Sequence, residues 1–200
     1  MNRRTVALGL LGAGAVALAA GAVMLSPSGG AMTAAPKNAG VGGPFALTAQ
    51  DGRIVTDEDL RGRPFAIFFG FTHCPDICPT TLFEMSVAME RLGPDADAMN
   101  FVFVTVDPDR DTPERLATYL AHFDERMIGL AGDAEETADI ARQYRVIYEK
   151  VPTSGDYTMN HTATIFLMDA EGEYAGAISY GESAELQIKK LRRLVGAAGV

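Results

Sequence analysis

Cys74 and Cys78 are the only cysteines of this 200-residue chain, and three residues separate them in "GFTHCPDICPTTL". Two thiols can exchange a disulfide with another protein, hold a soft metal ion or form a structural disulfide. Residues four apart in or near a helical turn lie on one side of it, so both sulfur atoms can point toward one place. They can equally form a disulfide if their Cα atoms come within about 7 Å. The two residues alone leave all three chemistries open.

A metal site here would require a third ligand, because two thiolates leave most metal ions under-coordinated. The chain offers three histidines. His73 is adjacent to Cys74 and would need a reversal of chain direction to bind the same ion. His122 is expected on the surface of a helix. His161 is expected in an irregular segment before an apolar strand, a position where a histidine usually has no special role.

The cysteines lie at the junction of a predicted strand and a predicted helix. "PFAIFFGF", which begins at Pro64, is a continuous apolar run typical of a buried central strand. From Pro79 to Leu92 apolar residues recur at helical spacing, and proline suits the first turn of a helix. Cys78 directly precedes Pro79, so the N–H groups and dipole of the helix are expected to favour its thiolate.

The rest of residues 44–200 alternates between strands and helices. Short extended runs on either side of Asp51-Gly52 predict an N-terminal hairpin. Further strands are predicted at 101–106 and 127–132, helices at 113–123 and 133–146, and a hairpin around Glu171-Gly172 followed by a helix at 183–195. This order predicts an α/β fold, a thioredoxin-like three-layer sandwich with a central mixed β-sheet.

The N-terminal segment, residues 1–25, is predicted to be a membrane anchor or a signal segment. Thr5 to Leu25 is a run of 21 uncharged residues that follows Arg3 and Arg4. A cleaved signal has an apolar region of roughly 7–15 residues, whereas about 20 can span a bilayer, so the length favours one uncleaved transmembrane helix. The arginines place its start in the cytoplasm and the domain on the extracytoplasmic side. Residues 26–43, rich in Gly, Ala, Ser and Pro, are expected to be a flexible linker.

The charge distribution argues against nucleic acid as a partner. The formal net charge is −9, and the only charges before Asp51 are three positive ones, which leaves −12 for residues 51–200. Such a surface repels phosphate backbones. An acidic surface most often serves solubility, although it also suits a cationic partner or a metal ion.

Several separated blocks of the sequence resemble one family. They are "FFGFTHCPDICPTTL", "FVTVDPDRDTPERL", "IGLAG", "YRVIYEK" and "DYTMNHTATIFLMDAEGEY", and their order and spacing are similar to those of the SCO/SenC proteins. Those proteins are membrane-tethered, thioredoxin-fold copper proteins that help to build the CuA centre of cytochrome c oxidase. The resemblance covers roughly Pro44 to Leu194.

The resemblance implies a copper site made of Cys74, Cys78 and His161. It also implies a metallochaperone, rather than an enzyme, that delivers copper to the CuA-bearing subunit of the oxidase on the periplasmic side of the membrane. A second periplasmic copper chaperone or a thiol reductase is an expected further partner. Thiolates suit Cu(I) and imidazole suits both Cu(I) and Cu(II), so either oxidation state is compatible with these ligands.

Two alternatives accompany this expectation. Cys74 and Cys78 can instead act as a redox pair that reduces the cysteines of the oxidase subunit before copper arrives, and the resemblance fits that role too. In an exported domain, the pair can also be a purely structural disulfide. A peroxiredoxin-like protein would share the fold, but the matched blocks speak against it.

The sequence departs from the family pattern beside the expected histidine ligand. Asn160 stands where the family usually has an acidic residue, which weakens the expected orientation of the His161 ring. Asp107 and Asp156 are candidates to supply the missing negative charge. Met159 is a soft residue next to this position, but its expected role is to fill the core.

Overall fold

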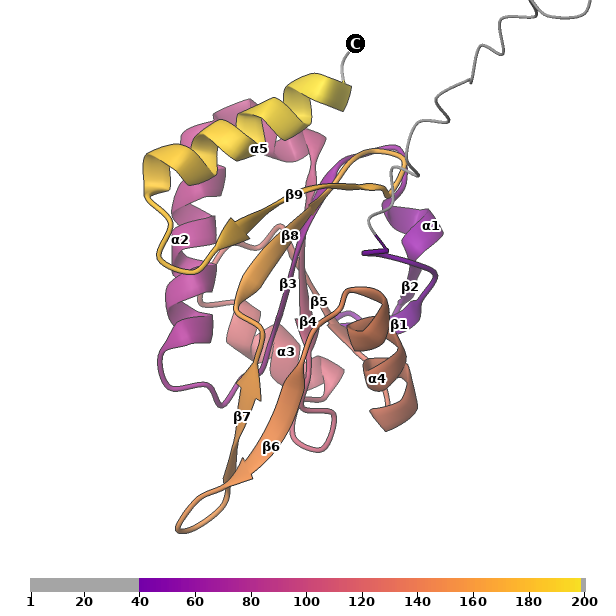
Figure 1. Cartoon of the computed structure of the whole chain (residues 1–200), viewed down its shortest axis with the longest axis vertical. Helices are drawn as coiled ribbons and strands as arrows, with labels where there is room; N and C mark the ends of the chain where they lie inside the picture. The colour runs from indigo at the N-terminus through magenta and orange to yellow at the C-terminus, as the bar shows by residue number, and fades with distance from the viewer. Residues whose placement is uncertain (1–39, 199–200) are drawn as a thin grey trace, which may run out of the picture. The chain divides into compact units, whose positions relative to one another are not determined.

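The computed structural model of the protein describes residues 40–198. These residues form a mixed seven-stranded sheet in the order β2-β1-β5-β4-β3-β8-β9 and a separate two-stranded sheet of β6 and β7. Helices flank the larger sheet on both faces (Figure 1). The predicted α/β sandwich with a central mixed sheet is therefore confirmed.

The first half of the domain contains the N-terminal hairpin and the strand that leads to the cysteines. Its elements are β1 (Ala46–Ala49), β2 (Ile54–Thr56), α1 (Asp57–Leu60), β3 (Phe65–Gly70), α2 (Ile77–Leu92), the 3₁₀ helix η1 (Gly93–Ala98) and β4 (Asn100–Thr105). The predicted hairpin around Asp51-Gly52 is confirmed, because β1 and β2 pair antiparallel and Gly52 has a φ of 84°.

The second half completes the sheet and adds the hairpin that contains His161. Its elements are α3 (Pro113–Leu120), β5 (Met127–Ala131), α4 (Ala134–Gln143), β6 (Tyr148–Pro152), β7 (Tyr157–His161), β8 (Thr164–Met168), β9 (Tyr174–Ser179) and α5 (Ala184–Ala198). Thr112 and Asp133 cap α3 and α4 with their side chains, as residues of these types commonly do. Helix α3 ends at Leu120, so His122 follows it instead of lying within it.

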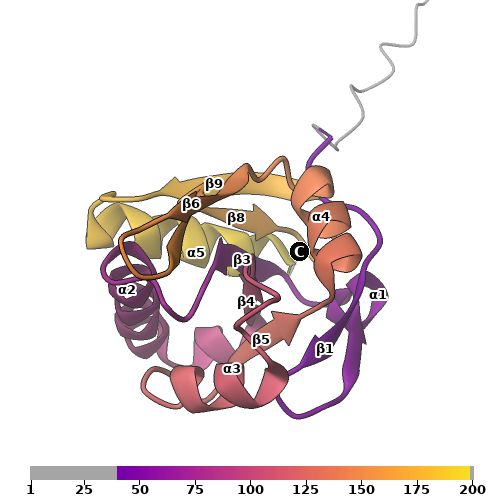
Figure 2. The same ribbon diagram turned by 90° about the horizontal axis from the view of Figure 1, so that it is seen from below.

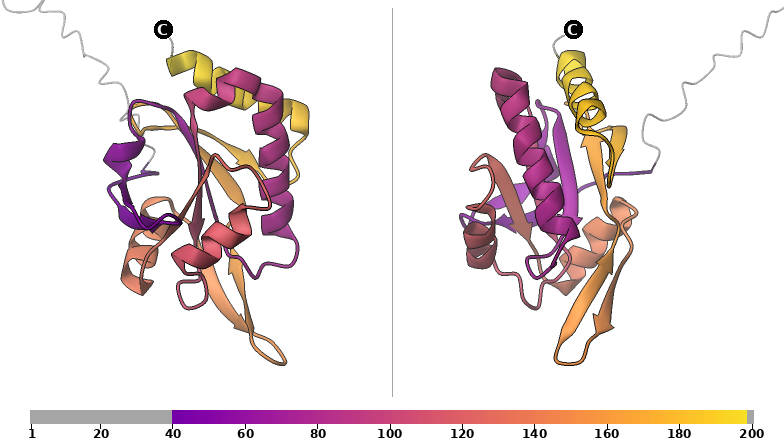
Figure 3. Two further views of the ribbon diagram at one scale, coloured as in Figure 1. Left: turned by 180° about the vertical axis from the view of Figure 1, so that it is seen from behind. Right: turned by 90° about the vertical axis from the view of Figure 1, so that its left-hand side faces the viewer.

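Seen from below, the sheet separates α4 from α2, α3 and α5 (Figure 2). Helices α2 and α5 pack side by side (Figure 3). Side chains along β3 point alternately to the two faces of the sheet, and all six residues are buried. Strand β3 therefore contributes to the core on both faces of the sheet. The ring of Phe69 packs against Tyr144 after α4, with 5.3 Å between centroids, whereas Gly70 faces α2 on the other side.

Three segments meet at one edge of the sheet because of the strand directions. Strands β3 and β4 are parallel, so the loops that follow them leave from the same edge. Strand β8 is antiparallel to β3, so the residues that precede Thr164 arrive at that edge as well. The cysteine loop, the loop after β4 and the end of β7 are thereby brought together.

The hairpin of β6 and β7 replaces the irregular segment expected before the apolar strand. Tyr148 pairs with His161 and Pro152 with Tyr157, and the Thr153 N–H donates to the Asp156 carbonyl at 2.8 Å across the turn. Exposed charged residues and a proline occupy β6, and its composition is not typical of a strand. The pairing is therefore a tertiary feature that the local sequence did not indicate.

The membrane segment predicted at residues 1–25 lies outside the described residues, as does most of the predicted linker. No helix within residues 40–198 is long and apolar enough to cross a membrane. Residues 40–43, which were assigned to the linker, are packed on the domain. Val41 is buried, the Gly42 N–H donates to the Gln143 carbonyl at 3.0 Å, and Arg145 donates to the Gly40 carbonyl at 2.9 Å.

Candidate metal centre

Cys74, Cys78 and His161 lie together at the sheet edge. Their ligand atoms, two Sγ atoms and one imidazole nitrogen, all lie within 4.8 Å of one another. The Sγ atom of Cys78 is 3.3 Å from Nε2 of His161, across 83 positions of sequence. Both thiols are free, which leaves them available to bind a metal or to exchange a disulfide.

The N-terminus of α2 explains how the cysteine loop is shaped. Asp76 occupies the N-cap position but makes no side-chain capping bond. The sulfur of Cys74 takes that role, because it accepts the Cys78 N–H at 3.4 Å. The helix consequently begins at Ile77, two residues before the predicted start at Pro79.

The two thiols have opposite electrostatic surroundings. A hydrogen bond from the Cys78 side chain, together with hydrogen bonds from the backbone N–H groups of Cys78 and Asp76, lowers the pKa of Cys74 to about 3. The same side-chain bond, together with burial, raises the pKa of Cys78. Cys78 is fully buried, whereas Cys74 is partly exposed. The expectation that the helix end favours the Cys78 thiolate was wrong, since the helix N–H groups point at Cys74.

The ring of His161 is oriented by its backbone neighbour and by two phenylalanines. Its Nδ1 lies 3.1 Å from the Thr162 carbonyl oxygen, which can only accept, so Nδ1 carries the hydrogen and Nε2 presents its lone pair toward the sulfurs. Edge-to-face contacts with Phe68 and Phe71, at centroid distances of 6.1 and 5.8 Å, fix the plane of the ring. The Thr162 carbonyl thus orients the His161 ring, a role for which the sequence analysis had considered the carboxylates of Asp107 and Asp156.

Close packing at the end of β3 gives the Cys78 sulfur its position. A Cβ at Gly70 would lie 2.8 Å from Cys78 Sγ and 2.8 Å from the ring of Phe103. The absence of a side chain at Gly70 lets the sulfur approach the strand closely. On the opposite, open side, a pocket of about 400 Å³ gives access to Cys74 and His161.

Asp111 holds the loop that precedes Cys74. Its buried carboxylate accepts the Thr72 N–H at 2.8 Å, the Thr72 hydroxyl at 2.6 Å and the Thr105 hydroxyl at 2.7 Å. Hydrogen bonds to a buried carboxylate are among the stronger ones in proteins. Asp111 is a residue that sequence reasoning did not single out, although it lies within the block "VDPDRDT" and follows a buried strand.

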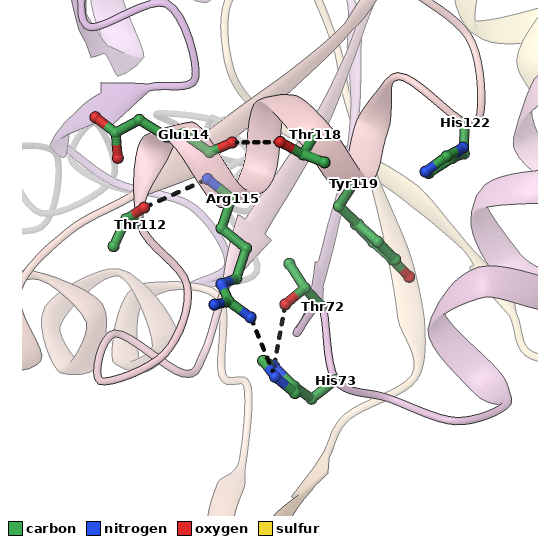
Figure 4. A pocket seen from close by; sticks show the side chains of 8 residues that line it. All are labelled: Thr72, His73, Thr112, Glu114, Arg115, Thr118, Tyr119 and His122. Carbon is green, nitrogen blue, oxygen red and sulfur yellow. Dashed lines mark hydrogen bonds between the residues drawn. The ribbon is translucent and has the colours of Figure 1, made fainter.

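The other two histidines lie in a separate pocket of about 560 Å³ beside α3 (Figure 4). His73 contacts the Thr72 hydroxyl and Arg115, each at 3.2 Å, and it lines that pocket. His122 lines the same pocket. Neither belongs to the thiol–imidazole group, in agreement with the assignment of His122 as an ordinary histidine and with the chain reversal that His73 would need to reach the same ion.

Asp107, Asp156 and Met159 do not join the ligand group. Asp107 and Asp156 both bind Arg110, at 2.6 and 3.0 Å, and Asp107 also accepts the Tyr157 hydroxyl at 2.7 Å. They therefore do not replace an acidic residue at position 160. Met159 is buried in the core, as expected.

The donor set suits a soft metal. Two sulfurs and one neutral imidazole match Cu(I) in a three-coordinate site, or Cu(II) with an added ligand, whereas a closed zinc site usually has four protein ligands. The cysteines, from the loop after β3, and His161, from the end of β7, would hold the ion between them. The fold and this group together define a thioredoxin-like domain with a soft-metal donor set at the start of its first long helix.

Known proteins with this arrangement match the chain along most of its length. The SCO1/SenC family model matches residues 33–196. The chain belongs to this family. Copper-bound ScoI of Bradyrhizobium japonicum shares 49% identity and a TM-score of 0.73 over 77% of this chain and 99% of that structure.

Curated relatives show the same similarity over different shares of their length. A SCO2-like protein of Rickettsia conorii is 38% identical over 151 residues, which are 74% of this chain and 74% of that protein. The mitochondrial SCO1 homolog 1 of Arabidopsis thaliana is 40% identical over 135 residues, which are 66% of this chain. The matched part spans only 40% of that longer protein.

Proposed function

We propose that this protein is a copper metallochaperone that binds one copper ion through Cys74, Cys78 and His161. The observation that carries the proposal is the grouping of their three ligand atoms within 4.8 Å. These atoms come from two segments that are 83 positions apart in sequence. A purely structural disulfide would not require the imidazole.

The protonation states of the ligands support copper binding. A metal ligand must offer a deprotonated sulfur or a neutral imidazole. Cys74 is already the acidic thiol, and Nε2 of His161 already presents a lone pair. Only the Cys78 proton would have to leave when copper binds. Copper-bound structures of relatives from Bradyrhizobium japonicum, Arabidopsis thaliana and yeast support the choice of metal.

The accessibility of the site supports transfer instead of permanent storage. Cys74 and His161 border an open pocket, while Cys78 is buried. An acceptor can therefore replace the exposed ligands one after another. We propose that the acceptor is the CuA-bearing subunit of cytochrome c oxidase, and that another periplasmic copper chaperone or a thiol reductase loads or reduces the site.

The location follows the same proposal. The uncharged run from Thr5 to Leu25, preceded by two arginines, would anchor the protein in the membrane with its domain on the periplasmic side. The residues between this membrane-spanning segment and Gly40 would then act as a flexible tether. Protease treatment of intact spheroplasts tests this arrangement, because it should remove the domain and leave a short membrane-bound fragment.

The delivery role is tested by direct transfer. The Cu(I)-loaded chain is mixed anaerobically with a reduced, metal-free CuA domain, and the copper content of each protein is measured after separation. We expect copper to move to the CuA domain from the parent. If copper stays on the parent, or moves at the same rate from a protein that lacks His161, delivery through this site is refuted.

The unequal thiols favour one alternative function. A partly exposed thiolate at Cys74 beside a buried, protonated Cys78 is suited to disulfide exchange. In that reaction the Cys74 thiolate would attack a target disulfide, and Cys78 would resolve the mixed disulfide. Two electrons would pass to the target, whose two thiols would take one proton from Cys78 and one from solvent. His161→Ala separates the functions, because exchange does not require an imidazole whereas copper binding does.

A further inference from the structure

Both segments that contain the proposed ligands are fastened to the same stretch of chain. This stretch, Asp107–Asp111, follows β4 and is called the anchor segment below. Its last residue, Asp111, binds Thr72 in the cysteine loop, as described above. Its other contacts reach the hairpin of β6 and β7, which contributes His161.

Arg110 makes most of the contacts between the anchor segment and the hairpin. Its Nε donates to Asp107 at 2.6 Å, and its Nη1 donates to the carboxylate of Asp156 and to the carbonyl of Tyr157, each at 3.0 Å. The guanidinium carbon lies 3.6 Å from the centre of the Tyr157 ring. The Arg110 side chain is only 15% exposed, so these interactions are weakly screened by solvent.

The hairpin needs such an anchor because its backbone pairs only with itself. Strands β6 and β7 form their own two-stranded sheet, and a lone two-stranded sheet is marginally stable in water. Tyr157 and His161 are at the two ends of β7, four residues apart, so they point to the same face of the strand. A shift of the hairpin at Tyr157 therefore moves the imidazole relative to the sulfurs.

A second connection runs through Phe71. The guanidinium carbon of Arg110 is 5.9 Å from the centre of the Phe71 ring, and the ring of His161 meets Phe71 edge to face with 5.8 Å between centroids. Phe71 directly follows β3, on the cysteine side of the site. Arg110 thus contacts both the strand that contains His161 and the aromatic residue on which the imidazole rests.

We infer that Arg110 is a positioning residue that holds His161 at the distance from Cys74 and Cys78 that copper requires. This inference rests on the proposed copper site. Arg110 touches none of the ligand atoms and acts through Tyr157 and Phe71. The Tyr157 hydroxyl, which donates to Asp107 at 2.7 Å, assists it, and burial together with this bond raises the Tyr157 pKa to about 12.

A double-mutant cycle tests the inference. Cu(I) affinity is measured by competition with a chromophoric chelator for the full chain, for Arg110→Gln, for His161→Ala and for the double variant. We expect Arg110→Gln to weaken binding about 10- to 100-fold in the parent, as loss of a ligand-orienting partner does. In the His161→Ala background it should change affinity less than about twofold, because the ligand it positions is absent. Equal losses in both backgrounds would overturn the inference.

A copper-free measurement separates this inference from the proposed function. In the metal-free protein, Arg110→Gln should speed amide hydrogen exchange in β6 and β7 while β3 and β4 stay protected. Unchanged exchange in the hairpin would refute the positioning role even if the protein binds copper. If the parent binds no Cu(I), the proposed function fails, and the exchange result still decides whether Arg110 fixes the hairpin.

Two further variants complete the design. Arg126→Gln is the matched control, because Arg126 also pairs with two carboxylates, Asp124 and Asp97, and does not contact the site. It should leave Cu(I) affinity unchanged. If Arg110→Gln does not fold, Tyr157→Phe removes only the hydroxyl bond to Asp107 and should weaken Cu(I) binding in the parent but not in the His161→Ala background.

Discussion

Cys74 and Cys78 have different surroundings, and these surroundings give the two sulfurs different chemical properties. The sulfur of Cys74 accepts hydrogen bonds at the N-terminus of α2 and is partly exposed. The sulfur of Cys78 is buried against Gly70 and beside His161. An incoming metal ion or disulfide therefore meets a thiolate at Cys74 and a neutral thiol at Cys78.

Alkylation of the reduced, metal-free protein tests this difference. Because the Cys74 pKa lies near 3, its thiolate fraction is complete well below neutral pH. The rate of its reaction with iodoacetamide should therefore be nearly constant between about pH 5 and 8. An ordinary thiol would react about tenfold faster with each pH unit in that range. Mass spectrometry locates the modified cysteine. The assignment of the thiolate to Cys74 would be refuted if Cys78 reacted first, or if the reaction rate of Cys74 rose tenfold with each pH unit.

The close approach at Gly70 yields a second prediction. Gly70→Ala places a methyl group 2.8 Å from Cys78 Sγ and from a ring carbon of Phe103, so one of them must move. We expect a loss of about 1–3 kcal/mol in unfolding free energy and weaker Cu(I) binding. Gly196→Ala is the control, because open space surrounds that position in α5, and it should leave Cu(I) affinity unchanged. Parent-like Cu(I) affinity in Gly70→Ala would contradict the packing described here.

At the scale of elements, the site is formed where two loops and the end of one strand come together at one edge of the sheet. The loop after β3 contributes the thiols, β7 contributes the imidazole, and the loop after β4 joins them through Asp111 and Arg110. No single element contains a complete site. The anchor segment therefore contacts both segments that contribute ligand atoms.

Asp111→Asn should destabilise the protein by weakening the contacts between the cysteine loop and the loop after β4. The buried carboxylate accepts three hydrogen bonds, and an amide would turn an NH₂ group toward at least one of these donors. We expect a loss of about 2–4 kcal/mol in urea unfolding. Asp109→Asn, which removes an exposed pairing with Lys150, should have a much smaller effect. Equal losses in the two variants would show that Asp111 has no special role.

The sequence predicted elements with strong periodicity and missed those made by tertiary contacts. The central strand, the helix after the cysteines and the two outer hairpins follow from apolar patterns and turn residues. Helix α2 begins two residues before its predicted start, because the sulfur of Cys74, and not a standard capping side chain, accepts the Cys78 N–H. The hairpin of β6 and β7 was missed because exposed polar residues and Pro152 conceal it.

The ligand set was predicted through resemblance to a family, and the fold explains why spacing alone was insufficient. The sequence offered three histidines as candidates for the third ligand. The topology of the fold brings only His161 close to both sulfurs. Arg110 and Asp111 were not predicted as parts of the site. Their contacts with the cysteine loop and the hairpin join residues 39 or more positions apart, which no local pattern reveals.

At the scale of the whole molecule, the domain presents a thiol–imidazole group at the open edge of a rigid sheet. Strand β3, buried on both faces, fixes the start of the cysteine loop, and β8 fixes the chain directly after His161. Residues 51–200 carry a net charge of −12, and a negatively charged domain attracts cations. Such a molecule is suited to hold a soft cation near its surface, as the proposed delivery of copper requires.

Copper stoichiometry of the reduced full chain tests the central claim most directly. The parent, Cys74→Ser, Cys78→Ser and His161→Ala are each titrated anaerobically with Cu(I) against a competing chelator, with His122→Ala as the control histidine. The structure predicts about one tightly held copper ion in the parent and in His122→Ala, and loss of tight binding in the other three. Retention of copper by all three ligand variants, or its absence from the parent, would contradict a two-thiolate, one-imidazole copper site.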